Sequence, residues 1–80
     1  MATLTVLYFA HLRDHRGLDQ EQLTTTAATP RGLYQELTQR HGFSLPERSV
    51  MVAINETMAQ WETPLRDGDT IVFLPPISGG

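Results

Sequence analysis

Cysteine and lysine are both absent from this chain of 80 residues. Without cysteine there can be no disulfide, no thiolate metal site and no cysteine nucleophile. Without lysine there can be no Schiff-base catalyst and no acceptor for an isopeptide bond within the chain. A domain this small hides only about 60% of the surface that its unfolded chain exposes. Its stability therefore has to come from a compact core of regular secondary structure.

Clustered positive charge and long apolar runs are missing as well. The net charge is −3, and all six basic residues are arginines scattered along the chain. Nucleic acids bind clusters of cations, so no nucleic-acid partner is expected. No apolar run approaches the roughly 20 residues that cross a bilayer, and the N-terminus lacks the pattern of a signal peptide. We expect a soluble cytoplasmic protein with no membrane partner.

The residue pattern predicts one long helix and four or five strands. Thr29 can cap a helix that begins at Pro30, and Gly42 can end it. A short helical turn is predicted over residues 10–16. The predicted strands cover residues 3–9, 21–26, 50–55 and 70–74, with a short strand and loop over 56–64 and a turn over 65–69. This order describes an α+β domain in which a mixed sheet packs on one main helix.

Two of the predicted strands, residues 50–54 and 71–74, are apolar on both faces. One helix can cover only one face of a sheet, whereas a strand with two apolar sides is usually buried on both. Side chains alternate along a strand, so Val72 and Leu74 should point away from the face that carries Phe73. We therefore expect another protein to cover the second face.

After the last strand the chain ends in PPISGG, residues 75–80. Pro75 and Pro76 cannot continue a sheet and favour the extended polyproline conformation, so they should direct the tail away from the domain. Gly79 and Gly80 have no side chains and can enter a narrow channel. The terminal carboxylate is ionised at neutral pH and resists attack until it is activated. As an acyl adenylate it can exchange AMP for sulfur and become a thiocarboxylate.

Four segments resemble the small subunit of molybdopterin synthase. They are FAHLR at 9–13, VAIN at 52–55, LRDGD at 65–69 and FLPPISGG at 73–80. The ending is specific, whereas the middle of the chain carries a likeness of fold alone. The resemblance implies a ubiquitin-like β-grasp domain over residues 1–74 and an extended tail over residues 75–80.

The same resemblance implies a sulfur carrier that is not an enzyme by itself. An E1-like adenylyltransferase would use ATP to activate Gly80, which is then converted to a thiocarboxylate. The tail, with Gly79 and Gly80 at its reactive end, would insert into the large catalytic subunit of molybdopterin synthase in a heterotetramer. There it would donate sulfur to cyclic pyranopterin monophosphate in molybdenum cofactor biosynthesis. No metal or cofactor is expected on this chain.

The resemblance also implies an apolar surface on the sheet that meets both partners. Leu74 departs mildly from the family, which commonly has an aromatic or other large apolar residue there. The implied partner-binding residues are Arg13, Met58, Leu74, Pro75, Pro76, Ile77 and Ser78.

Three other functions stay open. A sulfur carrier for thiamine thiazole synthesis also ends in Gly-Gly, and a ubiquitin-like protein modifier uses the same adenylation step. A plain binding module would have an inert tail.

Some side chains admit two interpretations. His11 and His15 are spaced to share a helix face, but zinc normally needs three or four protein ligands. Asp67 and Asp69 flank a glycine, which favours a turn over acid–base chemistry. Trp61 is expected to pack at the core or its rim.

Overall fold

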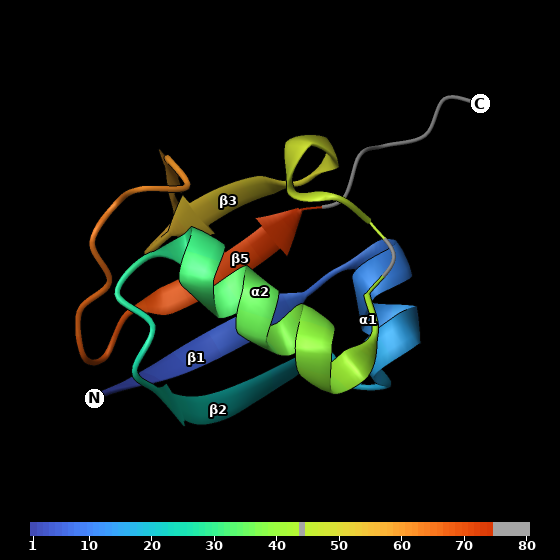
Figure 1. The fold of residues 1–80 in the computed structure, drawn as a ribbon, viewed down its shortest axis with the longest axis horizontal. Coiled ribbons are helices and arrows are strands. Elements are labelled where there is room, and N and C mark those ends of the chain that lie inside the picture. The colour runs from blue at the N-terminus through green and yellow to red at the C-terminus, as the bar shows by residue number, and fades with distance from the viewer. Residues whose placement is uncertain (44, 75–80) are drawn as a thin grey trace.

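The computed structural model describes residues 1–43 and 45–74. The elements in chain order are β1 (Ala2–Tyr8), α1 (Ala10–Arg16), β2 (Gln20–Thr25), α2 (Pro30–His41), the 3-10 turn η1 (Glu47–Ser49), β3 (Met51–Ile54), β4 (Thr57–Ala59) and β5 (Thr70–Leu74). The strands form one mixed sheet in the order β2-β1-β5-β3-β4. β1 and β5 run parallel, and the other neighbouring pairs are antiparallel. Because α2 lies across one face of this sheet (Figure 1), the predicted α+β arrangement is confirmed, with five strands.

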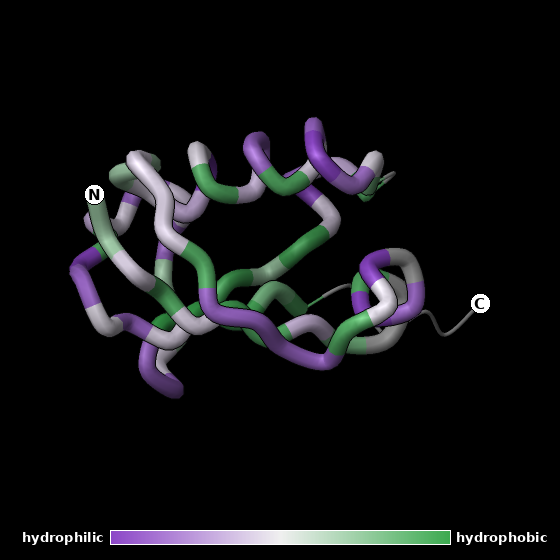
Figure 2. Tube along the Cα trace, turned by 90° about the horizontal axis from the view of Figure 1, so that it is seen from below, coloured by the Kyte–Doolittle hydropathy of each residue, from purple (hydrophilic) through white to green (hydrophobic). Residues whose placement is uncertain are grey.

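The main helix begins and ends as its sequence predicts. The Thr29 hydroxyl accepts a hydrogen bond from the Gly32 amide at 3.3 Å, and Gly42 ends the helix with a φ of 69°. Apolar stretches of α2 turn toward the sheet in Figure 2. The buried residues of the helix are Pro30, Leu33, Tyr34 and Leu37. In the part of the chain that the structure describes, no helix has the length and apolar character needed to span a membrane.

The core lies between α2 and the inner face of the sheet. Phe73, at the centre of the sheet, is fully buried; its ring stacks on Trp61 at a centroid distance of 5.9 Å and lies 5.2 Å from Tyr34. The predicted packing role of Trp61 is confirmed. The other strand residues of the core are Leu4, Val6, Tyr8, Val52 and Ile71.

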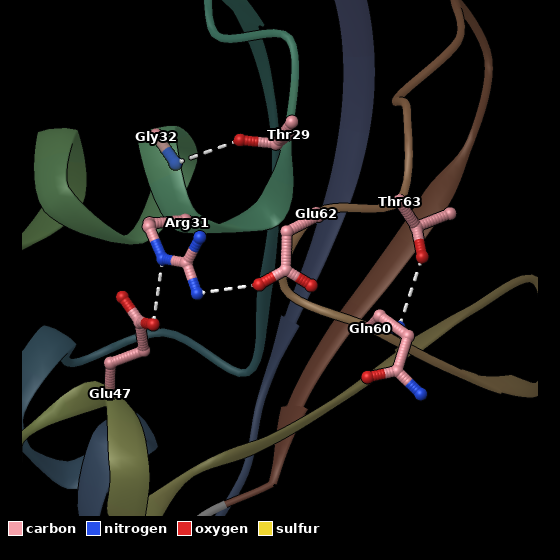
Figure 3. Close-up of polar contacts among 7 residues, drawn as sticks. All are labelled: Thr29, Arg31, Gly32, Glu47, Gln60, Glu62 and Thr63. Atoms are coloured by element: carbon pink, nitrogen blue, oxygen red, sulfur yellow. Dashed lines mark hydrogen bonds and ion pairs between the residues drawn. The ribbon is translucent and has the colours of Figure 1, made fainter.

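Arg31 joins three segments that are distant in the sequence (Figure 3). Its Nε donates to Glu47 at 2.8 Å, and one terminal nitrogen donates to Glu62 at 2.7 Å. These two carboxylates raise the pKa of the Arg31 guanidinium. The Arg31 amide also donates to the Trp61 carbonyl at 3.1 Å. Through these bonds α2 anchors both η1, which leads into β3, and the loop that connects β4 to β5.

Three predicted strands differ from the structure by one residue at each end. β1 ends at Tyr8, because Phe9 is already the N-cap of α1 in an extended conformation. β2 covers Gln20–Thr25 instead of residues 21–26. β3 is shorter than residues 50–55, because Val50 closes η1 and Asn55 turns the chain with a φ of 52°. β5 and α1 have the predicted bounds, and Gly17 ends α1 with a φ of 83°.

Candidate functional site

The sheet face opposite α2 carries an apolar surface at its centre. The strand register places Leu7 beside Val72, Val72 beside Ala53 and Ala53 beside Met58, across four neighbouring strands. On the same face Leu74 lies opposite Met51. We call this surface the apolar patch; its residues are Leu7, Met51, Ala53, Met58, Val72 and Leu74.

Exposure differs sharply between the two sides of β5. Phe73 is 0% exposed, whereas its neighbours Val72 and Leu74 are only half-buried, which confirms the predicted alternation. Met51 and Met58 are 59% and 53% exposed. The expectation that the whole second face lies open is wrong at one point, since Ala53 is buried. Its methyl group is short, and the longer side chains beside it shield it.

The rest of this face is polar but uncharged. The hydroxyl groups of Thr3 and Thr24 lie 3.2 Å apart across β1 and β2. The remaining outward residues of the sheet beyond the patch are Thr5, Gln20, Gln22 and Thr70. In the described strands, none of the outward positions carries a charged side chain, so a partner would meet apolar contact first and charge only at the rim.

The last described strand ends beside the apolar patch. β5 is the central strand, and its final residues pair with Tyr8 of β1 and with Met51 of β3. The tail begins at this point in the sequence. The residues predicted to form it lie outside the described residues: Pro75, Pro76, Ile77, Ser78, Gly79 and Gly80.

Arg13 lies on α1, which begins directly after β1 and therefore at the end of the sheet where β5 stops. Its Nε is 3.7 Å from Asp19 and 3.9 Å from Asp14, and about half of its side chain is exposed. Both contacts are long and solvent-exposed, so they hold the guanidinium only weakly and leave it able to bind another group. Its predicted role as a partner contact stays a prediction.

A polar cluster that the sequence does not reveal holds α1 against the sheet. Arg16 donates two hydrogen bonds to Glu21, at 2.9 and 3.0 Å, and the Tyr8 hydroxyl donates to the same carboxylate at 2.6 Å. The bonds from Arg16 and then from Tyr8 lower the pKa of Glu21. Burial and the Glu21 carboxylate raise the pKa of Tyr8 well above its usual value. No sequence pattern connects these three residues, because the fold brings them together across α1, β1 and β2.

The predicted turn at residues 65–69 is confirmed. Asp69 accepts from the Arg66 amide at 2.8 Å, Asp67 accepts from the Thr3 amide at 2.7 Å, and Gly68 has a φ of 88°. These carboxylates serve the backbone and leave no pair for acid–base chemistry.

The side chains of His11 and His15 lie outside what the structure describes. Among the residues it does describe, no group of three or more His, Asp or Glu side chains could hold a metal ion.

Comparisons with known proteins agree with this fold. The structure superposes on small archaeal modifier protein 1 from Methanosarcina acetivorans with a TM-score of 0.79 and 27% identity, covering 100% of this chain and 98% of that one. It also matches a chain in the complex of subunits 1 and 2 of the molybdopterin-converting factor from Helicobacter pylori, with a TM-score of 0.67, 25% identity and coverage of 98% and 99%. The fold is the expected ubiquitin-like β-grasp.

Sequence comparison extends the likeness to nearly the full chain. The molybdopterin synthase sulfur carrier subunit of Haemophilus influenzae is 36% identical over 80 residues, which cover 96% of this chain and 99% of that protein. The model of the ThiS family matches residues 6–80. The chain therefore belongs to the ThiS family, and its relatives include sulfur carrier subunits of molybdopterin synthase.

Proposed function

We propose that this chain is the sulfur carrier subunit of molybdopterin synthase and that its C-terminal carboxylate is the reactive group. The observation that carries the proposal is the end of β5. This central strand finishes beside an exposed apolar patch, and the sequence continues from it directly into PPISGG. The relationship to the sulfur carrier of Haemophilus influenzae supports the same function.

Activation would take place on an E1-like adenylyltransferase that binds ATP. A carboxylate oxygen of Gly80 attacks the α-phosphorus of ATP and releases pyrophosphate, which leaves an acyl adenylate. Hydrosulfide then attacks the acyl carbon, AMP departs with the electron pair of the broken C–O bond, and loss of the sulfur-bound proton leaves a thiocarboxylate. This chain supplies the acyl group and binds no cofactor of its own.

Delivery would require docking on the large catalytic subunit of the synthase. The apolar patch suits this docking because it leaves two methionines more than half exposed, and contiguous exposed apolar surface marks interaction sites. Gly79 and Gly80 would enter the active site of the large subunit, where sulfur passes to cyclic pyranopterin monophosphate. The related Helicobacter pylori protein was solved in a complex of subunits 1 and 2, which supports a two-subunit assembly. We propose a heterotetramer in which the large subunit provides the catalytic side chains.

Protein modification is the second candidate function. The likeness to a small archaeal modifier protein favours it, because a modifier shares the β-grasp fold and would use the same adenylation. The two functions differ after activation, since a modifier transfers its acyl carbon to an amine of another protein, whereas a carrier transfers sulfur and keeps its acyl group. Sulfur carriage for thiamine thiazole synthesis uses the same tail with another acceptor.

The intact mass of the chain tests this proposal. We expect chain purified from sulfurating cells to show one oxygen replaced by sulfur, and deletion of Gly80 to abolish both this change and sulfur transfer. The deletion should leave the circular dichroism spectrum unchanged, because Phe73 is the last core residue that the structure describes. Thr26→Ala is the control, since Thr26 is exposed and lies outside both the tail and the apolar patch. Normal sulfur transfer by the Gly80 deletion would refute the proposal, and ladders of conjugated proteins would favour the modifier.

A further inference from the structure

The turn between β3 and β4 holds an acidic residue in a backbone conformation that favours glycine. Asn55 and Glu56 are its two central residues, with φ values of 52° and 70°, and Ile54 pairs with Thr57 across it. Two positive φ values in a two-residue hairpin define a type I′ turn, in which Asn-Gly is strongly preferred. A side chain at the second position adds strain that glycine avoids.

The fold explains why Asn55 adopts a positive φ. Asparagine tolerates the left-handed region better than most residues. The side-chain oxygen Oδ1 of Asn55 accepts from the Thr70 amide at 2.9 Å, and the side-chain nitrogen of Asn55 donates to Asp69 at 2.9 Å. Asn55 therefore ties the turn to the start of β5.

The second residue has no such compensation. Glu56 is exposed, and in residues 1–43 and 45–74 its carboxylate takes part in no hydrogen bond or ion pair. The strain at this position is therefore not offset by any contact that the structure describes. Residues held in unfavourable backbone conformations cluster at functional sites. The strain at Glu56 therefore suggests a contact with another molecule.

Glu56 stands at the rim of the apolar patch. It is two residues from Met58, at the end of the sheet opposite Leu74, because β3 and β5 are antiparallel and Ile54 pairs with Ile71. Arg13 lies near the other end. The outward strand positions between them carry no charge, so the charges lie at the two ends of the apolar patch: Glu56 at one end, and Arg13 with two aspartates beside it at the other. Apolar contact alone is not directional, whereas charges at a rim orient a partner.

We propose that Glu56 is a specificity contact, whose carboxylate pairs with an arginine or lysine of the protein that docks on the apolar patch. The pair fixes the direction in which that partner lies along the sheet, and so aims the end of β5 at the partner's active site. The inference rests on the proposed function, because it takes the large synthase subunit as this partner.

Titration of the full chain against the purified large subunit at several salt concentrations tests this contact. We expect Glu56→Gln, which keeps the size of the side chain and removes its charge, to weaken binding about two- to fivefold at low salt, the range of an exposed ion pair. The loss should lie mainly in the association rate and shrink as salt screens the charge. Glu62→Gln changes the net charge equally on the helix side of the molecule (Figure 3) and should leave binding unchanged.

A second variant separates the strain from the charge. Glu56→Gly should raise Tm by roughly 4–8 °C, the shift that about 1 kcal/mol produces in a small domain, and it should weaken binding as Glu56→Gln does. If Glu56→Gln binds as tightly as wild type at low salt while Leu74→Glu fails to bind, the inference is wrong and the proposed function stands. If Leu74→Glu also binds normally, the apolar patch is not the docking surface, and both the inference and the docking step of the proposed function are wrong.

Discussion

At the scale of single residues, the cluster of Tyr8, Arg16 and Glu21 makes the stability of the fold depend on pH. Glu21 is ionised in the folded protein and its pKa is lowered, first by Arg16 and then by Tyr8. In the unfolded chain its pKa returns to about 4.3. The cluster therefore contributes its full stability above that pH, and the contribution is lost as the pH falls through the lower pKa of the folded state.

Glu21→Gln tests this dependence. At pH 7 we expect the free energy of unfolding to fall by about 2 kcal/mol, because hydrogen bonds to a charged group are lost and Arg16 keeps a charge without its partner. In strong acid the two proteins should converge, since wild-type Glu21 is then protonated. Urea unfolding at several pH values measures both effects. Glu56→Gln is the control. If the free energy of unfolding depends on pH equally in Glu21→Gln and in wild type, Glu21 is not the source of the pH dependence.

At the scale of secondary structure, the cap of α2 is a single contact that stabilises the first turn of the helix. Thr29→Ala removes the hydroxyl that accepts from the Gly32 amide. We expect a loss of about 1 kcal/mol, which lowers Tm by roughly 4–8 °C in a domain of this size. Thr26→Ala is the matched control, because Thr26 is exposed and makes no hydrogen bond in the described part of the chain. Similar melting temperatures for the two variants would show that the cap does not stabilise α2.

Sequence patterns predicted the elements better than their junctions, for physical reasons that particular residues show. Thr29, Pro30 and Gly42 are local signals whose effect does not depend on distant residues, so α2 was predicted to the residue. Phe9 is apolar and extended, so it continues the strand pattern even though it caps α1. The turn at Asn55 was missed because its second residue is a glutamate, and the glycine that marks such turns is absent.

For the candidate site too, local patterns predicted some features, whereas others depend on contacts between distant segments. Alternation along β5 predicted that Leu74 faces away from the core, and the register with β4 then places Met58 on the same face. The burial of Ala53 depends on neighbours from two other strands, and the contact between Tyr8 and Glu21 depends on the packing of β1 against β2. Neither can be derived before the strand order is known.

At the scale of the whole molecule, the sheet has one face for stability and one for docking, and β5 serves both. Phe73 and Leu74 are adjacent, yet Phe73 is fully buried under α2 and Leu74 is only partly buried in the apolar patch. Leu74→Glu should therefore weaken binding to the large subunit more than tenfold, because it sets an unpaired charge in an apolar contact. The cost to stability should stay near 1 kcal/mol, whereas truncation of a buried phenylalanine costs about 3–5 kcal/mol.

Two controls make this division measurable. Gln22→Glu adds the same charge to the polar half of the same face and should bind normally, because Gln22 lies on the edge strand β2, away from the apolar patch. Phe73→Ala should lower Tm strongly, and whatever fraction stays folded should still bind. Binding is measured by calorimetry and stability by thermal unfolding. If Leu74→Glu unfolds the protein as Phe73→Ala does, or if Gln22→Glu abolishes binding equally, the two faces do not have separate roles and docking does not depend on the apolar patch.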